Sequence, residues 1–365
     1  MENENLLPPM PPSPEITKGR RLSPIAVCAA IILTASVVCH GFIVGAVIKS
    51  VPDEALSRIL TSHLLPNYTF AERAVSLEYY EAEPLPGGAE VQDEDIIVRD
   101  ISANAENGFA IANTTGYAPD LSALSALPSP IEKRDRLYER YLEGEPLVLV
   151  YHTHGTESYR DTNDSGAFRS GDCEKNAVSV GKVMCAALEK AGIPSVHMTE
   201  PFDAESYNDA YYNSSSAVAE FLKSHPSVKY VIDLHRDCIM DGDGNYTAPT
   251  YTDEKGTSFA QIMFVVGTDE GGSGHREWEK NLTVALHLQS LLHNAHKGLM
   301  RPINLRSPSF YQHTSPGAML LEMGACGNSL AEAKRSAVLF ALGLADYVWG
   351  RPTGLDPYII IEELC

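Results

Sequence analysis

The feature that most constrains the fold is an alternation of short apolar runs with longer helical stretches from Leu147 onward. Apolar runs of strand length occur at 147–151, 195–198, 230–234, 260–266 and 318–323. Between them, the residue pattern predicts helices at 174–191, 207–224, 278–296 and 330–348. This alternation is typical of an α/β fold, a mostly parallel sheet with helices on both faces. Active sites in such sheets lie at the carboxyl ends of the strands.

Residue types that bind metals stand at the ends of three of these strands. His154 follows the first strand, His235 follows the third, and Glu322 lies near the end of the last. A fourth segment, 172–176, opens a helix and contains Glu174. Two histidines and a carboxylate are the ligand set of a catalytic zinc that keeps one position open for water, and a further carboxylate can accept that water's proton. The pattern therefore favours a zinc hydrolase.

Length, charge and cysteine spacing exclude several classes of protein. The 365 residues suffice for one sizeable domain with appendages, and the net charge of -20 leaves no basic face for nucleic acid or for tight binding to anionic lipid. The seven cysteines lack CxxC spacing, which argues against a thiolate zinc knuckle and a disulfide scaffold. Most are expected to be buried small apolar residues, although Cys173 and Cys238 lie beside candidate site residues, which leaves a reactive thiol open there.

The N-terminal part indicates a membrane anchor. A basic cluster at 18–21 precedes an uncharged apolar run at 25–48, which as a helix is long enough to span a bilayer. We therefore expect a cytoplasmic tail at 1–21, a transmembrane signal anchor at 22–48, and the remainder outside the cell membrane. A cleaved signal peptide is the alternative, but the run is longer than the usual apolar region of such peptides.

The rest of the chain divides by composition. Residues 49–95 are acidic and contain Gly and Pro, as expected of an extracytoplasmic stalk. Short strands are expected at 96–101 and 108–113, and a helix at 132–142. The catalytic domain is expected to cover 96–350, with a C-terminal tail at 351–365.

The order of these motifs resembles a known enzyme family. His-Gly after a strand, Glu-Lys opening a helix, apolar-Asp-x-His and then Leu-Glu-x-Gly resemble the zinc-dependent N-acetylmuramoyl-L-alanine amidases of bacterial cell walls. The segment YHTHGTESY at 151–159 is more similar still to the stage II sporulation protein P family, a membrane-anchored branch. The segments NTTGY at 113–117 and QHTSPG at 312–317 also resemble that family, and the resemblance covers roughly 96–350.

The resemblance implies a sporulation enzyme that cleaves peptidoglycan during engulfment. The implied activity is that of an N-acetylmuramoyl-L-alanine amidase, with an associated endopeptidase activity on cross-linked stem peptides. The implied partners are peptidoglycan and the stage II sporulation proteins D and M. A catalytically inactive protein on the same fold, binding the wall or forming a complex, is the alternative function. Another zinc hydrolase, such as a deacetylase or carboxypeptidase, is a third.

The expected zinc ligands are His154, Glu174 and His235. His154 matches the histidine of the amidase His-Gly motif. His152, two positions earlier, is the alternative ligand, because alternate residues of a strand point to the same face. If His154 is the ligand, we expect His152 to contact substrate. Glu157 is the alternative to Glu174, whose place at a helix start also has an ordinary explanation in the helix dipole.

The remaining site residues are expected to do chemistry or to orient the ligands. Glu322 is the expected catalytic base, taking a proton from the attacking water and delivering it to the leaving amine. Asp233 and Asp237 are both candidates to orient the ring of the third ligand. Arg236 is expected to contact substrate and to help stabilise the oxyanion, and His313 is expected to contact substrate.

Overall fold

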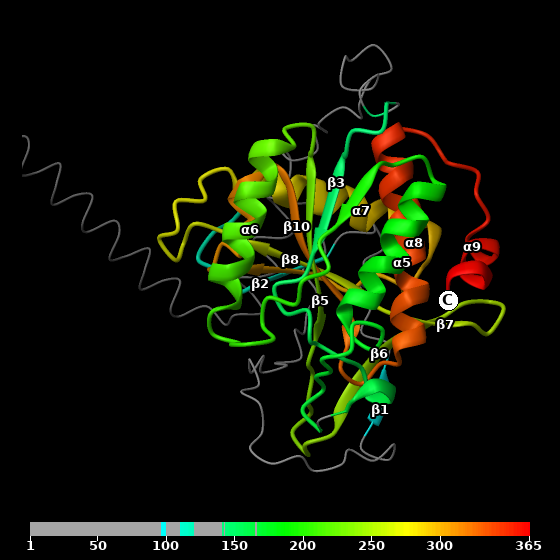
Figure 1. Ribbon diagram of the computed structural model, residues 1–365. Coiled ribbons are helices and arrows are strands. Elements are labelled where there is room, and N and C mark those ends of the chain that lie inside the picture. Colours follow the sequence, from blue (N-terminus) through cyan, green and yellow to red (C-terminus); the bar gives the residue numbers. More distant parts are fainter. Residues whose placement is uncertain (1–95, 100–109, 120–140, 142, 165) are drawn as a thin grey trace, which may run out of the picture. The chain divides into compact units, whose positions relative to one another are not determined.

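The computed structural model describes residues 96–99, 110–119, 141, 143–164 and 166–365 (Figure 1). All of them fall in one of the two units into which the chain divides, Asn67–Cys365. The expected anchor and stalk, and most of the helix expected at 132–142, lie outside the described residues. Among the helices within the described ranges, none is both long and apolar enough to cross a membrane.

A seven-stranded sheet forms the centre of the described unit, in the order β2-β9-β8-β10-β5-β3-β4 (Figure 1). Its strands are β2 (Ile111–Asn113), β3 (Val148–Tyr151), β4 (Ser195–His197), β5 (Tyr230–Asp237), β8 (Ile262–Gly267), β9 (Ile303–Arg306) and β10 (Gly317–Ala325). Every neighbouring pair is parallel except β8 with β10. The mostly parallel α/β sheet predicted from the sequence is thereby confirmed.

Helices cover both faces of this sheet. The main core packs α5 (Ala177–Lys190), α7 (Trp278–Ala295) and α8 (Leu330–Trp349) against one face. On the other face, α6 (Ala210–Ser224) packs Val218 against Leu149 and Val231. Successive side chains of a strand point to opposite faces, so Val148 and Val150 of β3 enter the main core while Leu149 joins α6. Both faces of the central strands are therefore buried, which explains their unbroken apolar runs.

Several elements differ from the sequence prediction in extent or existence. Strand β5 continues three residues beyond the predicted end, to Asp237. Helix α5 begins at Ala177, because the side chain of Asn176 caps it by accepting a hydrogen bond from the Val178 amide. A second sheet, in the order β1-β6-β7, was not predicted as such. Its strands are β1 (Ile96–Arg99), β6 (Tyr246–Thr252) and β7 (Ser258–Ala260).

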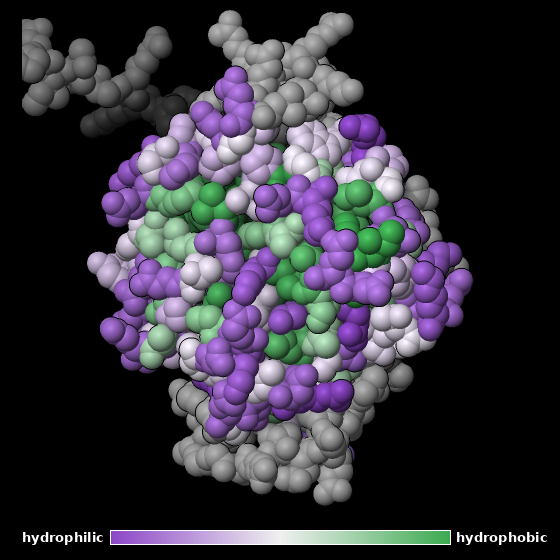
Figure 2. Space-filling model, turned by 45° about the vertical axis from the view of Figure 1, so that its right-hand side comes forward, coloured by the Kyte–Doolittle hydropathy of each residue, from purple (hydrophilic) through white to green (hydrophobic). Residues whose placement is uncertain are grey.

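The segment 351–365 is more than the tail expected from the sequence. It contains helix α9 (Pro357–Leu364), which begins where Asp356 accepts a hydrogen bond from the Tyr358 amide. Ile360 of this helix is buried in the main core, and Glu363 pairs with Lys190 of α5 at 2.5 Å. Figure 2, which turns this side of the molecule forward, shows hydrophilic and apolar side chains interspersed over the surface. The C-terminal helix is thus part of the domain.

Candidate active site

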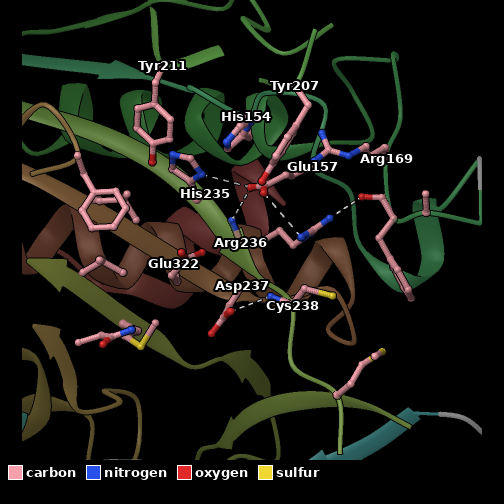
Figure 3. A pocket seen from close by; sticks show the side chains of 18 of the residues that line it. His154, Glu157, Arg169, Tyr207, Tyr211, His235, Arg236, Asp237, Cys238 and Glu322 are labelled. Carbon is pink, nitrogen blue, oxygen red and sulfur yellow. Dashed lines mark hydrogen bonds and ion pairs between the residues drawn. The ribbon is translucent and has the colours of Figure 1, made fainter. Parts of the chain in front are cut away.

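A pocket of about 570 Å³ lies on the α6 face of the sheet, at the carboxyl end of β5. Its walls include the turn after β3, the start of α6 and the ends of β5 and β10 (Figure 3). The pocket is therefore at the edge of the sheet where the sequence placed the active site. The charged and polar residues that line it include His154, Glu157, Arg169, His235, Arg236, Asp237 and Glu322.

Strand register brings His235 and Glu322 together. The two residues are direct partners across the parallel pair β5 and β10. Neighbouring partners point their side chains to the same face, so both carboxylate and imidazole face the pocket. Asp233 and Asp237, two positions before and after His235, lie on that face by the same alternation.

The first potential ligand pair is His235 with Glu157. Nδ1 of His235 lies 3.5 Å from Oε2 of Glu157. Two ligands of a tetrahedral zinc, each about 2.1 Å from the metal, are separated by about 3.4 Å. The observed separation of the two atoms therefore suits a shared ion.

His154 completes the group around the Glu157 carboxylate (Figure 3). Its ring centroid lies 5.4 Å from that of His235, and its Nδ1 is buried with no hydrogen-bond partner. The ring stacks on Tyr207 at a centroid distance of 4.2 Å, and Oδ2 of Asp203 lies 3.8 Å from Nδ1. Burial lowers the pKa of His154 to about 4, so its ring is neutral at pH 7, as a metal ligand must be.

Asp233 orients the ring of His235 from the side away from Glu157. Its Oδ1 lies 2.9 Å from Nε2 of His235, which leaves Nδ1 to face the pocket. The same carboxylate accepts hydrogen bonds from the Thr153 amide at 2.8 Å and the Thr153 hydroxyl at 2.7 Å. Burial alone would lower the pKa of His235, but Asp233 and Glu157 together raise it well above its usual range. Of the two candidates named from the sequence, Asp233 is the residue that contacts the ring.

Arg236 holds Glu157 and the loop around it. Its backbone amide donates to Oε2 of Glu157 at 3.1 Å, and its Nη1 lies 3.7 Å from Oε1. Its Nε and Nη2 donate to the carbonyls of Ser158 and Phe168 at 2.9 and 2.6 Å. Burial alone would raise the pKa of Glu157, but Arg236 and His235 hold it well below its usual range. The guanidinium lines the pocket, yet its donors are used within the protein, so the substrate contact expected of Arg236 is not what this geometry favours.

One oxygen of the Glu322 carboxylate has no hydrogen-bond partner. Its Oε2 is buried and accepts no hydrogen bond. Burial, followed by repulsion from Asp237, raises the pKa of Glu322 to about 8. A half-buried carboxyl group with a raised pKa, facing a pocket beside candidate ligands, has the environment of a general acid or base.

Glu174 requires a correction, because the structure does not bring it to the histidines. Its side chain is 67% exposed and pairs with Lys182 at 2.8 Å. Glu174 lies before the start of the helix. Its backbone amide donates a hydrogen bond to the side chain of Asp172, which closes a turn there. Glu157, which the sequence offered only as the alternative, takes its place. The turn that folds Glu157 back over His154, through a hydrogen bond from its amide to the His154 carbonyl, puts the two side chains at one site.

His152 and His313 also lie away from the pocket. His152 is fully buried, with Nδ1 at 2.9 Å from the Leu234 carbonyl and Nε2 at 2.8 Å from Nε2 of His197. It follows the last residue of β3, so the strand alternation that linked it to His154 no longer applies. His313 is an exposed residue of the short helix η3 (Gln312–Thr314), beside Tyr311. Neither is placed to contact a substrate in this pocket.

The chemistry of the donor atoms suits zinc, although the three side chains do not surround a common point. His154, Glu157 and His235 offer two neutral-capable imidazoles and an ionised carboxylate, the set found in catalytic zinc sites. Within the part of the chain that the structure describes, no three His, Cys, Asp or Glu side chains already converge closely enough to hold an ion.

Two solved structures share some similarity with this chain. One is the N-acetylmuramoyl-L-alanine amidase from Clostridium difficile 630, at 14% identity, covering 57% of this chain and 96% of that one, with a TM-score of 0.30. The other is the catalytic domain of CwlV, an N-acetylmuramoyl-L-alanine amidase from Bacillus (Paenibacillus) polymyxa var. colistinus. It is 15% identical and covers 56% of this chain and 97% of that one, with a TM-score of 0.29. At these TM-scores the likeness carries no argument.

The sequence comparisons are more specific. Stage II sporulation protein P of Bacillus subtilis (strain 168) is 29% identical over 218 residues, which are 56% of this chain and 51% of the relative. The chain thus spans about half the length of this curated relative. The model of the family "Stage II sporulation protein P" matches residues 89–345, most of the chain. The chain therefore belongs to the stage II sporulation protein P family.

Proposed function

We propose that the protein is a zinc-dependent peptidoglycan hydrolase of sporulation. The bond cleaved is the amide between the lactyl group of N-acetylmuramic acid and L-alanine. The observation that carries this proposal is the convergence of His154, Glu157, His235 and Glu322 on one pocket. Family membership supports the link to sporulation.

Three side chains would hold the metal. His154 and His235 would each offer a ring nitrogen, and Glu157 a carboxylate oxygen. When bound, zinc would supply Lewis acidity toward the amide carbonyl and an ionisable water near neutral pH. Asp233 would keep the ring of His235 in place, because it occupies the second nitrogen.

Glu322 would move the proton. It would accept a proton from the attacking water at Oε2, the atom that has no partner in the protein. It would then give this proton to the nitrogen of the departing L-alanine. A pKa of about 8 is close to the working pH, which suits a group that takes up and releases a proton in one cycle.

The other parts of the proposal concern substrate range and setting. A second cleavage, of cross-linked stem peptides, belongs to the same site. Stage II sporulation proteins D and M are the proposed partners. A single-pass anchor at 22–48 would hold the domain against the wall on the outer side of the cell membrane.

Product identification from purified peptidoglycan tests the activity. The full-length chain, purified in mild detergent, is incubated with the polymer, and released fragments are identified by mass spectrometry. We expect stem peptides with an L-alanine amino terminus, which disappear with a chelator and return with zinc. Glu322→Gln should retain zinc and lose about 10²–10⁴-fold in rate.

The control and the opposing outcomes are equally specific. Glu174→Gln makes the same chemical change on an exposed side chain and should leave the rate unchanged. Release that survives chelation would exclude the metal mechanism. Binding of zinc and peptidoglycan without any release would favour the alternative, a wall-binding or complex-forming protein on the same fold.

A further inference from the structure

Two cysteine thiols lie in contact at the rim of the pocket. Sγ of Cys238 is 2.9 Å from Sγ of Cys326, although the residues are 88 positions apart in the sequence. Cys238 follows the last residue of β5 and lines the pocket, and Cys326 follows the last residue of β10. Both are free thiols in this structure. These two strands carry His235 and Glu322, so the thiols join the two sides of the proposed catalytic group.

The backbone around the thiols is already arranged as a disulfide requires. Asp237 and Ala325 are partners across β5 and β10, so the two cysteines come next on each strand. The amide of Cys326 donates to the carbonyl of Asp237 at 2.7 Å. Neighbouring strands are about 4.8 Å apart, within the Cα separation of about 4.4–6.8 Å that disulfides span. Because an S–S bond is about 2.05 Å long, the sulfurs have less than about 1 Å to travel.

We propose that Cys238 and Cys326 form a reversible disulfide that staples the end of β5 to the end of β10. The reaction is thiol–disulfide exchange with a small-molecule or protein disulfide as the oxidant. The thiolate of Cys238 attacks one sulfur of that disulfide and releases a thiolate, which leaves a mixed disulfide on Cys238. The thiolate of Cys326 then attacks Sγ of Cys238 and releases the second thiolate. The protein loses two electrons and two protons, and the oxidant becomes two thiols.

Accessibility determines the order of attack. Cys238 is half-buried and faces the pocket, so an external disulfide can reach it. Cys326 is fully buried and can react only with its neighbour. The electrostatics agree: the Cys326 thiol, and then Arg236, lower the pKa of Cys238 against the effect of burial, whereas burial raises the pKa of Cys326.

The disulfide is expected to stabilise the fold without closing the pocket. It would close a loop of 88 residues, and long loops give large entropic stabilisation of the folded state. The strand ends are already hydrogen-bonded, so the bond requires little movement of the residues before them. The pair therefore acts as a staple suited to an oxidising exterior, rather than as a switch of the site.

Mass spectrometry and thermal unfolding test the proposal. The full chain is reduced, treated with oxidised glutathione, and digested without reduction after the remaining thiols are alkylated. We expect a peptide pair cross-linked through Cys238 and Cys326, and an apparent Tm higher by roughly 10 °C, both reversed by a phosphine reductant. Cys238→Ser should abolish both effects, and Cys173→Ser, a half-buried cysteine of another segment, should retain them.

Either of two results would overturn the proposal. One is the absence of the cross-linked pair from fully folded, oxidised wild-type chain, a result that does not depend on any variant. The other is a melting temperature that does not change between oxidised and reduced chain. Neither readout uses hydrolysis or zinc, so both are independent of the proposed function.

Discussion

The replacement of Asp233 by asparagine isolates the charge that supports the proposed ligand His235. Oδ1 of Asp233 accepts a hydrogen bond from the Thr153 amide and lies 2.9 Å from Nε2 of His235, while Oδ2 accepts one from the Thr153 hydroxyl. An asparagine oxygen can occupy the Oδ1 position. Its NH₂ group can then donate to the Thr153 hydroxyl, which in turn can donate to the hydroxyl of Ser214, 2.9 Å away. Both Thr153 hydrogen bonds survive in Asp233→Asn, while the negative charge beside His235 is lost.

The expected magnitude follows from this geometry. A hydrogen bond to a charged group contributes about 1.5–3 kcal/mol and one between neutral groups about 0.5–1.5 kcal/mol. The difference, about 1–1.5 kcal/mol, is a factor of roughly five to thirteen in an equilibrium constant. We therefore expect Asp233→Asn to bind zinc about tenfold more weakly, at the low end of the effects seen when carboxylates behind metal ligands are changed.

The assay is a competition titration against a chromophoric zinc chelator, with thermal unfolding to verify the fold. Asp233→Ala provides the comparison, because it leaves the buried Thr153 amide without an acceptor and should destabilise the fold as well. If Asp233→Asn bound zinc within twofold of wild type, Asp233 would not act through the charge on His235, and the assignment of this pair would be refuted.

Three further predictions concern the packing and charges behind the site. Gly181→Ala should lower the free energy of unfolding by about 1–2 kcal/mol, because the new Cβ would lie 2.6 Å from Nε2 of both His152 and His197; a more stable variant in urea unfolding would contradict this packing. Burial lowers the pKa of His152 to about 4, whereas the histidine of the unfolded chain takes up its proton near pH 6.5. The free energy of unfolding should therefore fall by up to about 3 kcal/mol between pH 6.5 and pH 4 because of this group. Urea unfolding at several pH values should show that the free energy of unfolding depends less steeply on pH in His152→Gln than in the wild type. An equal dependence on pH in both would refute the assignment to His152. Arg236→Met should destabilise the fold by about 3 kcal/mol, since the buried Glu157 carboxylate loses its guanidinium partner, and the double variant Arg236→Met/Glu157→Gln should recover part of that loss.

Hydrophobic pattern predicted the strands of the central sheet other than β9, and the four helices α5 to α8. The apolar runs at 147–151 and 230–234 became β3 and β5, because strands buried on both faces have no polar positions to interrupt them. The hydrophobic pattern was a weaker guide to elements whose position depends on packing against other elements. Helix α9 was read as a tail, since its burial arises from packing on the core and not from its own sequence.

The candidate site was predictable where strand ends determined it. His154, His235 and Glu322 line one pocket because parallel strands end at one edge of the sheet. Glu157 and Glu174 were not separable by sequence, since each stands in a polar segment after His154. In the structure, Glu157 reaches the site because it lies three positions after His154 and a tight turn brings the two side chains together. Asp172 and Asn176 are equally suitable helix caps, so the sequence did not show that the helix begins after Glu174.

Contacts between residues far apart in sequence were beyond prediction. Nothing in the scattered cysteines indicated that Cys238 and Cys326 would touch, because their meeting depends on the register between β5 and β10. The same register sets Glu322 beside His235. A single sequence contains the strands but not their pairing.

The central claim is that the metal ligands are His154, Glu157 and His235, and zinc stoichiometry tests it most directly. Wild-type chain, Glu157→Gln and Glu174→Gln are purified identically, and bound zinc is measured by elemental mass spectrometry. We predict one zinc ion per chain in the wild type and in Glu174→Gln, and loss of the metal in Glu157→Gln. Retention of zinc by Glu157→Gln together with its loss from Glu174→Gln would contradict the account and return the ligand role to Glu174.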